Sequence, residues 1–184
     1  MATQPLTGLT YADLERFPDD NFRRELIDGE LIVSPAPSTR HQRAVVALVM
    51  AFGGYAKEHG GEVFPAPTDV FFSDTNVVEP DVLFLSAERA GRIEERFIRD
   101  APDLVIEVSS PSTRRLELVR KRELYERFGV PEYWYVDLEA DRVEVYRLKG
   151  DRYPAPELFK AGDVVASRHI PGLTAAVDEI VGRQ

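Results

Sequence analysis

The chain of 184 residues contains no cysteine, so disulfides and thiolate metal sites are excluded. It also has no stretch that approaches the roughly 18–20 uncharged apolar residues needed to span a bilayer. Its first residues, Met1-Ala2-Thr3-Gln4-Pro5, lack the basic and apolar regions of a signal peptide. These absences lead us to expect a cytoplasmic protein.

The composition is otherwise typical of a globular protein, with 43% hydrophobic and 30% charged residues. The length suits a single domain over residues 1–184 with a short flexible N-terminus, about residues 1–8. The formal net charge of −9 argues against a protein whose whole surface coats nucleic acid, although it leaves room for a local basic groove.

Hydrophobic periodicity and turn residues predict interleaved helices and strands. An Asp28-Gly29 pair between two apolar runs is a strong hairpin signal. Ser38 or Thr39 can begin a long core helix that Gly60-Gly61 ends. We expect helices at 11–17, 38–59, 112–128 and 174–181, and strands within 62–72, 78–85, 104–109, 132–136, 142–148 and 152–170. This order predicts a mixed α/β sheet flanked by helices.

Two acids lie in apolar runs that we expect to be strands. Asp81 follows a proline in the run Val78 to Leu85, and Glu107 stands in the middle of Leu104 to Ser109. An ionised carboxylate in a buried strand lacks water, so it needs a compensating partner. Two such acids on strands close in sequence suggest a shared metal site.

The helix expected at 112–128 carries charge on its apolar stripe. At about 100° per residue, one arc holds Leu118, Leu124, Tyr125 and Phe128, and Glu117 and Lys121 fall in the same arc. A Glu and a Lys spaced i, i+4 contribute only about 0.2–0.5 kcal/mol, too little to explain both on a buried face. Either they form a half-exposed pair at the edge of the stripe, or, as we prefer, Lys121 points at the strand acids.

Basic residues are also concentrated in this helix: Arg114, Arg115, Arg120, Lys121, Arg122 and Arg127. They form either a nucleic-acid-binding patch or a solvated face that the glutamates of the same helix balance.

Several of these residues stand in an ordered set: Pro80-Asp81, Glu107-Val108-Ser109-Ser110-Pro111-Ser112-Thr113, a lysine-bearing helix, and Gly129-Val130-Pro131-Glu132-Tyr133-Trp134. From about Leu9 to Gly172 the chain resembles the PD-(D/E)XK nuclease superfamily, and within it the bacterial Uma-type restriction endonucleases. The resemblance implies a restriction-endonuclease-like α/β core with an additional N-terminal hairpin and C-terminal strands. It also implies a homodimer that cleaves DNA with Mg²⁺ or Mn²⁺.

The resemblance assigns the metal to Asp81, Glu107 and the main-chain carbonyl of Val108. A literal superfamily motif would place lysine at position 109, where this chain has Ser109. The Uma-type branch moves the lysine to the following helix, which points to Lys121 as the catalytic lysine. Glu117 would hold Lys121 in place or act as an outer acid.

Two further candidates come from the N-terminal part of the chain. Glu25 matches an acid of the family and is a candidate catalytic residue, although a solvent-facing strand acid is an equal alternative. His41 lies in the first turn of its helix, where the family also has a histidine that could contact phosphate or the metal. Taken alone, it would more often be a surface or packing residue. With Arg114 and Arg115 it is our candidate for nucleic-acid binding.

Oxygen ligands without cysteine suit Mg²⁺, and such ions support phosphodiester hydrolysis. Three alternatives remain. One is a non-catalytic descendant of the nuclease fold that binds nucleic acid or protein. Another is a dimerisation domain that uses edge strands and exposed aromatics at Tyr133-Trp134-Tyr135. The third, a metal-dependent phosphatase, lacks support because the chain has no phosphate-binding Gly-Lys-Ser/Thr loop.

Overall fold

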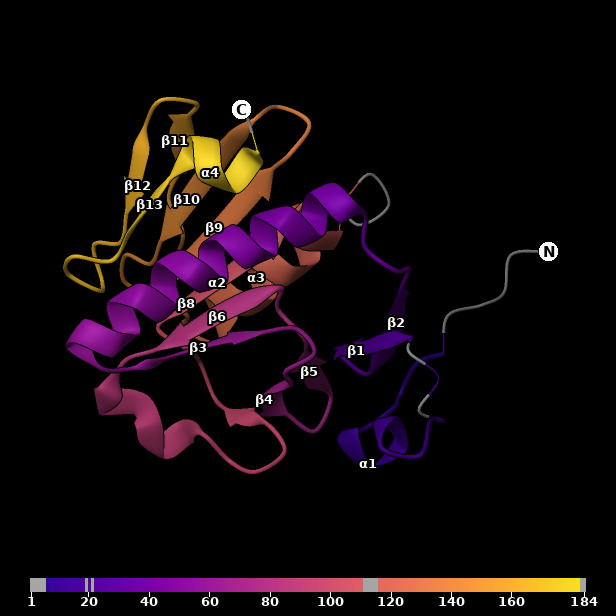
Figure 1. The fold of residues 1–184 in the computed structure, drawn as a ribbon. Helices are drawn as coiled ribbons and strands as arrows, with labels where there is room; N and C mark the ends of the chain where they lie inside the picture. The colour runs from indigo at the N-terminus through magenta and orange to yellow at the C-terminus, as the bar shows by residue number, and fades with distance from the viewer. Residues whose placement is uncertain (1–5, 19, 21, 111–115, 183–184) are drawn as a thin grey trace.

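The computed structural model of the protein describes residues 6–18, 20, 22–110 and 116–182, apart from the side chain of Glu117. Within these ranges the strands form two main sheets and a two-stranded ribbon, and helices pack against them (Figure 1). The predicted mixed α/β fold class, with its N-terminal hairpin and additional C-terminal strands, is confirmed.

Six strands form the central sheet, in the order β11-β10-β9-β8-β6-β3. Strands β8 and β9 run parallel, with Glu107 opposite Tyr135, and the other neighbours are antiparallel. The bounds are β3 (Glu62–Pro65), β6 (Val82–Leu85), β8 (Leu104–Val108), β9 (Glu132–Asp137), β10 (Arg142–Arg147) and β11 (Glu157–Lys160). The strands predicted at 104–109, 132–136 and 142–148 are therefore confirmed.

Five shorter strands form the N-terminal sheet, in the order β2-β1-β5-β4-β7. They are β1 (Arg23–Ile27), β2 (Glu30–Ser34), β4 (Val70–Ser73), β5 (Asn76–Val78) and β7 (Ile98–Arg99). The predicted hairpin joins β1 to β2, and its turn residues Asp28 and Gly29 have φ of 52° and 74°. Positive φ at both positions is the requirement of the turn that matches strand twist, which explains the Asp-Gly pair.

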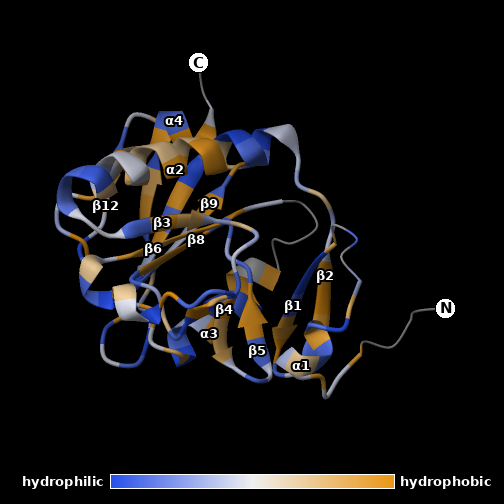
Figure 2. Ribbon diagram, turned by 60° about the horizontal axis from the view of Figure 1, so that its bottom comes forward, coloured by the Kyte–Doolittle hydropathy of each residue, from blue (hydrophilic) through white to orange (hydrophobic). Residues whose placement is uncertain are grey.

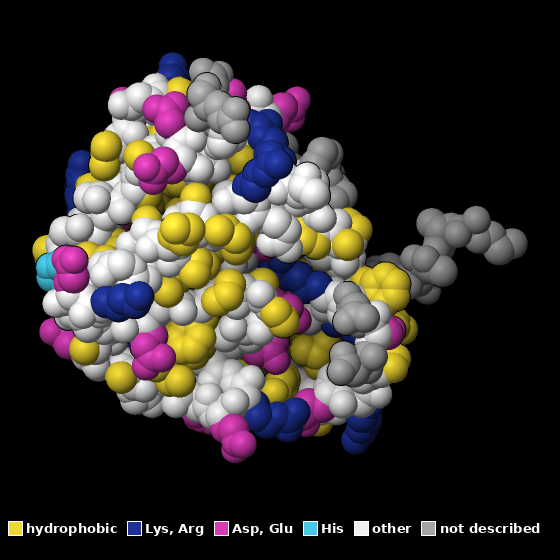
Figure 3. Space-filling model, viewed as in Figure 1, with side chains coloured by type: hydrophobic (Ala, Val, Ile, Leu, Met, Phe, Trp, Pro, Cys, Tyr) yellow, Lys and Arg dark blue, Asp and Glu magenta, His cyan; other side chains and the backbone are white. Residues whose placement is uncertain are grey.

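Helix α2 (Thr39–His59) begins at Ser38, whose side chain accepts a hydrogen bond from the backbone N–H of His41. It crosses the near face of β6, β8 and β9 in Figure 1 and buries Leu48 and Phe52 against them. The prediction of a core helix is correct for one side of α2 only, because Val46 is 55% and Met50 72% exposed. Figure 3 shows hydrophobic side chains across this face of the molecule.

The strand predicted at 78–85 is two strands. Its first residue belongs to β5 of the N-terminal sheet, and Val82–Leu85 form β6 of the central sheet. Between them, Glu79-Pro80-Asp81 carry the chain from one sheet to the other. Proline has no N–H to donate to a strand ladder, which accounts for the interruption at this point.

The helix predicted at 112–128 is less regular than expected. Its described part is a π-helical segment at Leu116–Lys121 followed by α3 (Arg122–Arg127). The predicted inward arc is correct for Lys121, Leu124 and Tyr125, which are all buried.

Other predicted helices are shorter than expected. Helix α1 spans Tyr11–Leu14, where Thr10 and Asp13 form a capping box. Helix α4 spans Val177–Val181, because residues 174–176 instead form β13 (Thr174–Ala176), which pairs with β12 (Val164–Ala166).

Two apolar clusters pack on opposite faces of the central sheet, and the hydrophobic stretches of strands and helices are orange in Figure 2. One cluster includes residues of α2 and α4, and the other includes residues of α3 and the N-terminal sheet. Strand β9 lies between β8 and β10, so Tyr133, Trp134 and Tyr135 are fully buried. The expectation that these aromatics are exposed for dimerisation was wrong.

Candidate active site

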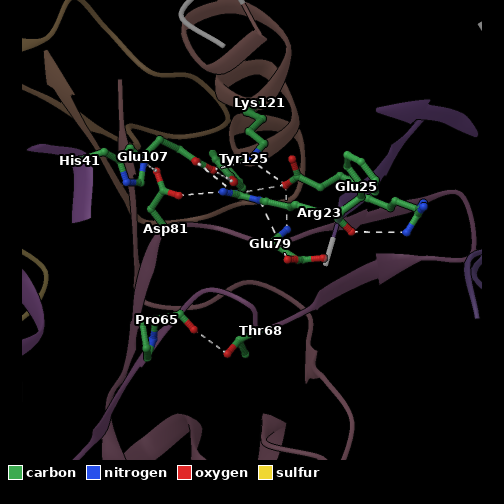
Figure 4. A network of polar contacts seen from close by, with 12 residues as sticks. Arg23, Glu25, His41, Pro65, Thr68, Glu79, Asp81, Glu107, Lys121 and Tyr125 are labelled. Carbon is green, nitrogen blue, oxygen red and sulfur yellow. Dashed lines mark hydrogen bonds and ion pairs between the residues drawn. The ribbon is translucent and has the colours of Figure 1, made fainter. Parts of the chain in front are cut away.

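A cleft of about 630 Å³ opens where the two sheets meet. Strand β1, the first turn of α2, the connection between β5 and β6, strand β8 and the helix that ends at Arg127 each supply polar side chains near its floor. Figure 4 shows the side chains that converge there: Arg23, Glu25, His41, Asp81, Glu107, Lys121 and Tyr125. The predicted site residues Asp81, Glu107, Lys121 and Glu25 are thus brought together.

Asp81 immediately precedes β6 and is 2% exposed. Its Oδ2 accepts a hydrogen bond from the backbone N–H of Val108 (2.8 Å) and lies 3.1 Å from Nε2 of His41. Burial alone would raise the pKa of this carboxyl, but the His41 hydrogen bond and the charge of Arg23 lower it below its usual value. Asp81 is therefore held as an anion at neutral pH.

Glu107 lies in the middle of β8 and is fully buried. Its Oε1 accepts hydrogen bonds from the hydroxyl of Tyr125 (2.5 Å) and from Nζ of Lys121 (2.9 Å). Burial raises the pKa of Glu107 despite the nearby ammonium of Lys121. Burial and the adjacent carboxylate likewise raise the pKa of Tyr125 well above its usual value, so its hydroxyl keeps its proton.

Glu25 is 1% exposed, which excludes the solvent-facing alternative for this acid. Its Oε1 lies 2.6 Å from Nζ of Lys121 and accepts a hydrogen bond from the backbone N–H of Glu79 (2.8 Å). Lys121 therefore bridges Glu25 and Glu107. Burial alone would lower the pKa of the lysine, but these two carboxylates raise it, so Lys121 is an ammonium ion.

The guanidinium of Arg23 lies among the same acids. Its Nη1 is 2.7 Å from Oδ1 of Asp81, and its Nη2 is 3.6 Å from Oε1 of Glu25 and 3.7 Å from Oε2 of Glu107. The more distant Glu79 lies 4.0 Å from Nε, and burial raises its pKa to about 7. Burial disfavours the charge of Arg23, but the surrounding carboxylates raise its pKa well above the usual value.

The donor atoms suit a hard divalent cation in kind. They are carboxylate oxygens, and Oε2 of Glu25 and Oε2 of Glu107 are buried without a hydrogen-bond partner. Within the described ranges, however, no three His, Asp or Glu side chains are spaced to hold a metal ion. The positive charge at the centre of the acids comes from Arg23 and Lys121.

Ser109, which stands where the superfamily motif has lysine, has a structural contact. Its hydroxyl accepts a hydrogen bond from the backbone N–H of Leu138 (2.9 Å), just beyond the end of β9. The lysine that reaches Glu107 comes instead from the helical segment, as the sequence predicted.

Parts of the predicted nucleic-acid surface cannot be placed. Arg114, Arg115 and the side chain of Glu117 lie outside the described residues. Of the other basic residues of this helix, Arg120 pairs with Glu30 (2.9 Å) and Arg127 with Asp28 (2.8 Å). These two arginines are balanced by acids of the β1–β2 hairpin and not, as the alternative supposed, by the glutamates of their own helix.

Sequence reasoning missed two residues of the site. Arg23 stands two positions before Glu25, and this spacing puts both side chains on one face of β1. Tyr125 stands four positions after Lys121 on the same helical arc, but an aromatic residue on an apolar stripe is indistinguishable from ordinary core.

The described residues form a restriction-endonuclease-like fold, with the acids at the junction of its two sheets. A crystal structure described as "a putative nuclease belonging to DUF820", from Anabaena variabilis, is similar to this chain with a TM-score of 0.78 and 21% sequence identity. The similarity covers 95% of this chain and 98% of that one, and at this identity it shows the fold alone.

The chain belongs to the Uma2 family, described as "Putative restriction endonuclease", whose pattern matches residues 11–178. The family resemblance read from the sequence is thereby confirmed. A search of curated proteins finds no match. None of the helices in the described ranges combines the length and hydropathy needed to cross a bilayer.

Proposed function

We propose that this protein is a Mg²⁺- or Mn²⁺-dependent endonuclease that hydrolyses phosphodiester bonds of DNA. The observation that supports the proposal is the convergence of buried acids and one lysine at the floor of a cleft. Lys121 lies within 2.9 Å of both Glu107 and Glu25, and Asp81 reaches the same centre through Arg23. A pure binding surface gains nothing from burying ionised acids, since burial of a charge is unfavourable.

Asp81, Glu107 and the main-chain carbonyl of Val108 are the proposed metal ligands, with Glu25 as a further acid. A bound divalent ion would generate a hydroxide nucleophile and neutralise charge on the phosphate. Before any ion binds, the chain already orients its ligands. His41 and the Val108 N–H hold Asp81, and the Tyr125 hydroxyl holds Glu107.

Lys121 acts in this proposal as a charge and a hydrogen-bond donor. Because its pKa is raised, its amine is protonated at neutral pH and is a poor base. Its ammonium would stabilise negative charge that develops on the phosphate oxygens. Glu25 and Glu107 fix its position from two sides.

The substrate and assembly are also part of the proposal. DNA is the substrate class, with Arg114 and Arg115 as the proposed phosphate contacts and His41 as a residue at the cleft wall. A homodimer is the proposed assembly, since β2 is an edge strand of its sheet and Val33 on it is 50% exposed.

The direct test is incubation of the protein with plasmid and with single-stranded DNA across Mg²⁺ and Mn²⁺ concentrations. We expect metal-dependent nicking by the wild type and its loss in Lys121→Ala. Arg122→Gln is the matched control, because it removes the neighbouring cation, which lies over the ring of Tyr146 rather than at the acids. Equal cleavage by wild type and Lys121→Ala would point to a contaminant and contradict the proposal.

A non-catalytic descendant of the fold is the second candidate, and one observation favours it. Arg23 and Lys121 already face Asp81, Glu25 and Glu107, so the site is largely charge-balanced without a metal. This alternative predicts DNA or protein binding with no cleavage at any metal concentration.

A further inference from the structure

Arg23 occupies the place that a cation would take among the three acids. Its guanidinium contacts Asp81, Glu25 and Glu107 at 2.7, 3.6 and 3.7 Å, respectively. These acids come from three different segments of the chain, before β6, on β1 and on β8. The guanidinium is therefore a point where all three segments meet through charge (Figure 4).

Most contacts between Arg23 and the three acids are ion pairs without a hydrogen bond. Only Nη1 makes a hydrogen bond to an acid, at 2.7 Å from Asp81. The buried Nε and Nη2 atoms have no hydrogen-bond partner, and neither do Oε2 of Glu25 and Oε2 of Glu107. A buried ion pair is stabilised fully only when its remaining donors and acceptors are satisfied. A cation that satisfies more of these carboxylate oxygens could consequently replace the guanidinium of Arg23.

Arg23 also has room to move. It is one of the residues that line the cleft, and its side chain is 23% exposed, whereas Glu107 is fully buried. Although Nε and Nη2 are buried, the side chain borders the cleft, so rotation about its side-chain bonds would carry the guanidinium from the acids into the cleft.

We propose that Arg23 is an exchangeable internal counter-ion, which holds the three acids together in the metal-free protein and competes with the divalent ion for them. Arg23 thereby sets how tightly the protein binds metal. This inference rests on the proposed function, because it assumes that the acids are a metal site.

The test compares Arg23→Gln with wild type and with a matched control, Arg24→Gln. Arg24 is the adjacent residue on β1, and its guanidinium pairs with Asp20 at 2.7 Å, outside the acid cluster. Binding of Mn²⁺ alone is measured by equilibrium dialysis, and Mg²⁺-induced stabilisation by thermal unfolding. Neither readout requires cleavage activity.

Arg23→Gln should bind Mn²⁺ about tenfold tighter or more, as expected if the arginine vacates the acids in about a tenth of wild-type molecules or fewer. It should also unfold at a lower temperature without metal and gain more from Mg²⁺ than wild type does. Arg24→Gln should match wild-type affinity. Arg23→Lys restores a positive charge, so its Mn²⁺ affinity should return close to the wild-type value.

Unchanged Mn²⁺ affinity in Arg23→Gln, with measurable binding by wild type, would overturn this inference and leave the proposed nuclease intact. Equally tight binding by Arg23→Lys and Arg23→Gln would also overturn it, because charge would then not be the competitor. If neither wild type nor Arg23→Gln binds Mn²⁺, both the inference and the metal-dependent function fail.

A readout on the wild-type protein covers the case in which Arg23→Gln does not fold. Phenylglyoxal modifies accessible arginines, and mass spectrometry assigns each modified position. Adding Mg²⁺ should increase modification of Arg23 several-fold and leave Arg24 unchanged. No change, or a decrease, at Arg23 would overturn the exchange.

Discussion

Lys121 is a fully buried cation with two buried carboxylate partners, so its removal has consequences for stability as well as activity. Lys121→Met keeps the length of the side chain but leaves Glu25 and Glu107 facing each other with one cation fewer. Breaking a buried pair from one side typically costs about 3–5 kcal/mol. We expect a loss of this order in the free energy of unfolding, measured by urea denaturation.

A double variant separates the two roles of Lys121. Adding Glu25→Gln to Lys121→Met removes one of the uncompensated charges and should recover part of the lost stability. It should not recover DNA cleavage. Recovery of both would show that the lysine serves the fold alone.

Asp69 is not a proposed metal ligand, and its ionisation should make the stability of the fold depend on pH. Burial, followed by the charge of Glu25, raises its pKa to about 6. A raised carboxyl pKa means that the folded state holds a proton that the unfolded state has released, so stability falls as pH rises from about 4 to 6. Asp69→Asn should remove this fall and raise stability at pH 8 by about 1–2 kcal/mol, a value reduced for its partial exposure.

The control for this prediction is Asp151→Asn, at an exposed turn position. Urea unfolding at pH 4.5 and pH 8 should show a pH-dependent gain for Asp69→Asn and none for Asp151→Asn. A gain of equal size at both pH values would contradict the assigned ionisation.

At this scale the sequence predicted the acids and Lys121 because their charge conflicts with their apolar surroundings. Arg23 was missed because it stands in a charged Arg-Arg-Glu run, where nothing in the pattern distinguishes a buried arginine from an exposed one. Arg23 is half-buried, and the acids that it contacts, Asp81 and Glu107, are distant in the chain.

At the scale of elements, alanine substitutions at two glycines near the end of α2 should change stability in opposite directions. Gly61 has a φ of 93°, and a Cβ there would lie 2.6 Å from the carbonyl oxygen of Leu85 on β6. Gly54 is exposed within α2, and a Cβ there would meet nothing within 4 Å. The two positions are only seven residues apart but differ in the space around them.

Gly61→Ala should destabilise the protein by at least about 2 kcal/mol, since both the backbone conformation and the contact are unfavourable. Gly54→Ala should stabilise it by about 0.5–1 kcal/mol, because alanine loses less entropy in a helix than glycine does. Thermal or urea unfolding of the two variants measures both effects. A neutral Gly61→Ala would mean that β6 does not pack as closely against this turn as described.

Element boundaries were predictable where local chemistry decides them. Asp28-Gly29 at the hairpin and Ser38 at the start of α2 are examples, since each residue meets a requirement of its own backbone. Pro80 and Asp81 were predicted to lead into a strand, but the division of Val78 and Val82–Leu85 between two sheets was not predicted, because the apolar run continues on both sides of the proline. Only the two sheets to which β5 and β6 belong reveal that the strand is divided.

At the scale of the whole molecule, the net charge of −9 limits how DNA can bind. Arg23 and Lys121 are the only arginine and lysine among the described residues that line the cleft, and both contact acids. Each phosphate neutralised contributes about −0.9 to the slope of log affinity against log salt concentration. We expect a slope of about −2, or about −4 if Arg114 and Arg115 also contact phosphates.

Fluorescence anisotropy of labelled duplex DNA over a range of salt concentrations measures this slope, with Ca²⁺ present to limit cleavage. A much steeper slope would place DNA on a different surface.

The presence of two sheets, rather than one mixed sheet, was also not predicted from sequence. Sheet membership depends on pairing between distant strands, which local patterns do not specify.

The connection Glu79-Pro80-Asp81 has a consequence for how the chain tolerates changes in length. It joins the two sheets and also supplies Asp81, so a residue inserted between Val78 and Val82 would shift the acid and misalign the layers together. Single-residue insertions should therefore be excluded here and accepted at the exposed turn of Gly150 and Asp151. In an insertion library selected for folded protein, we expect no insertions between Val78 and Val82.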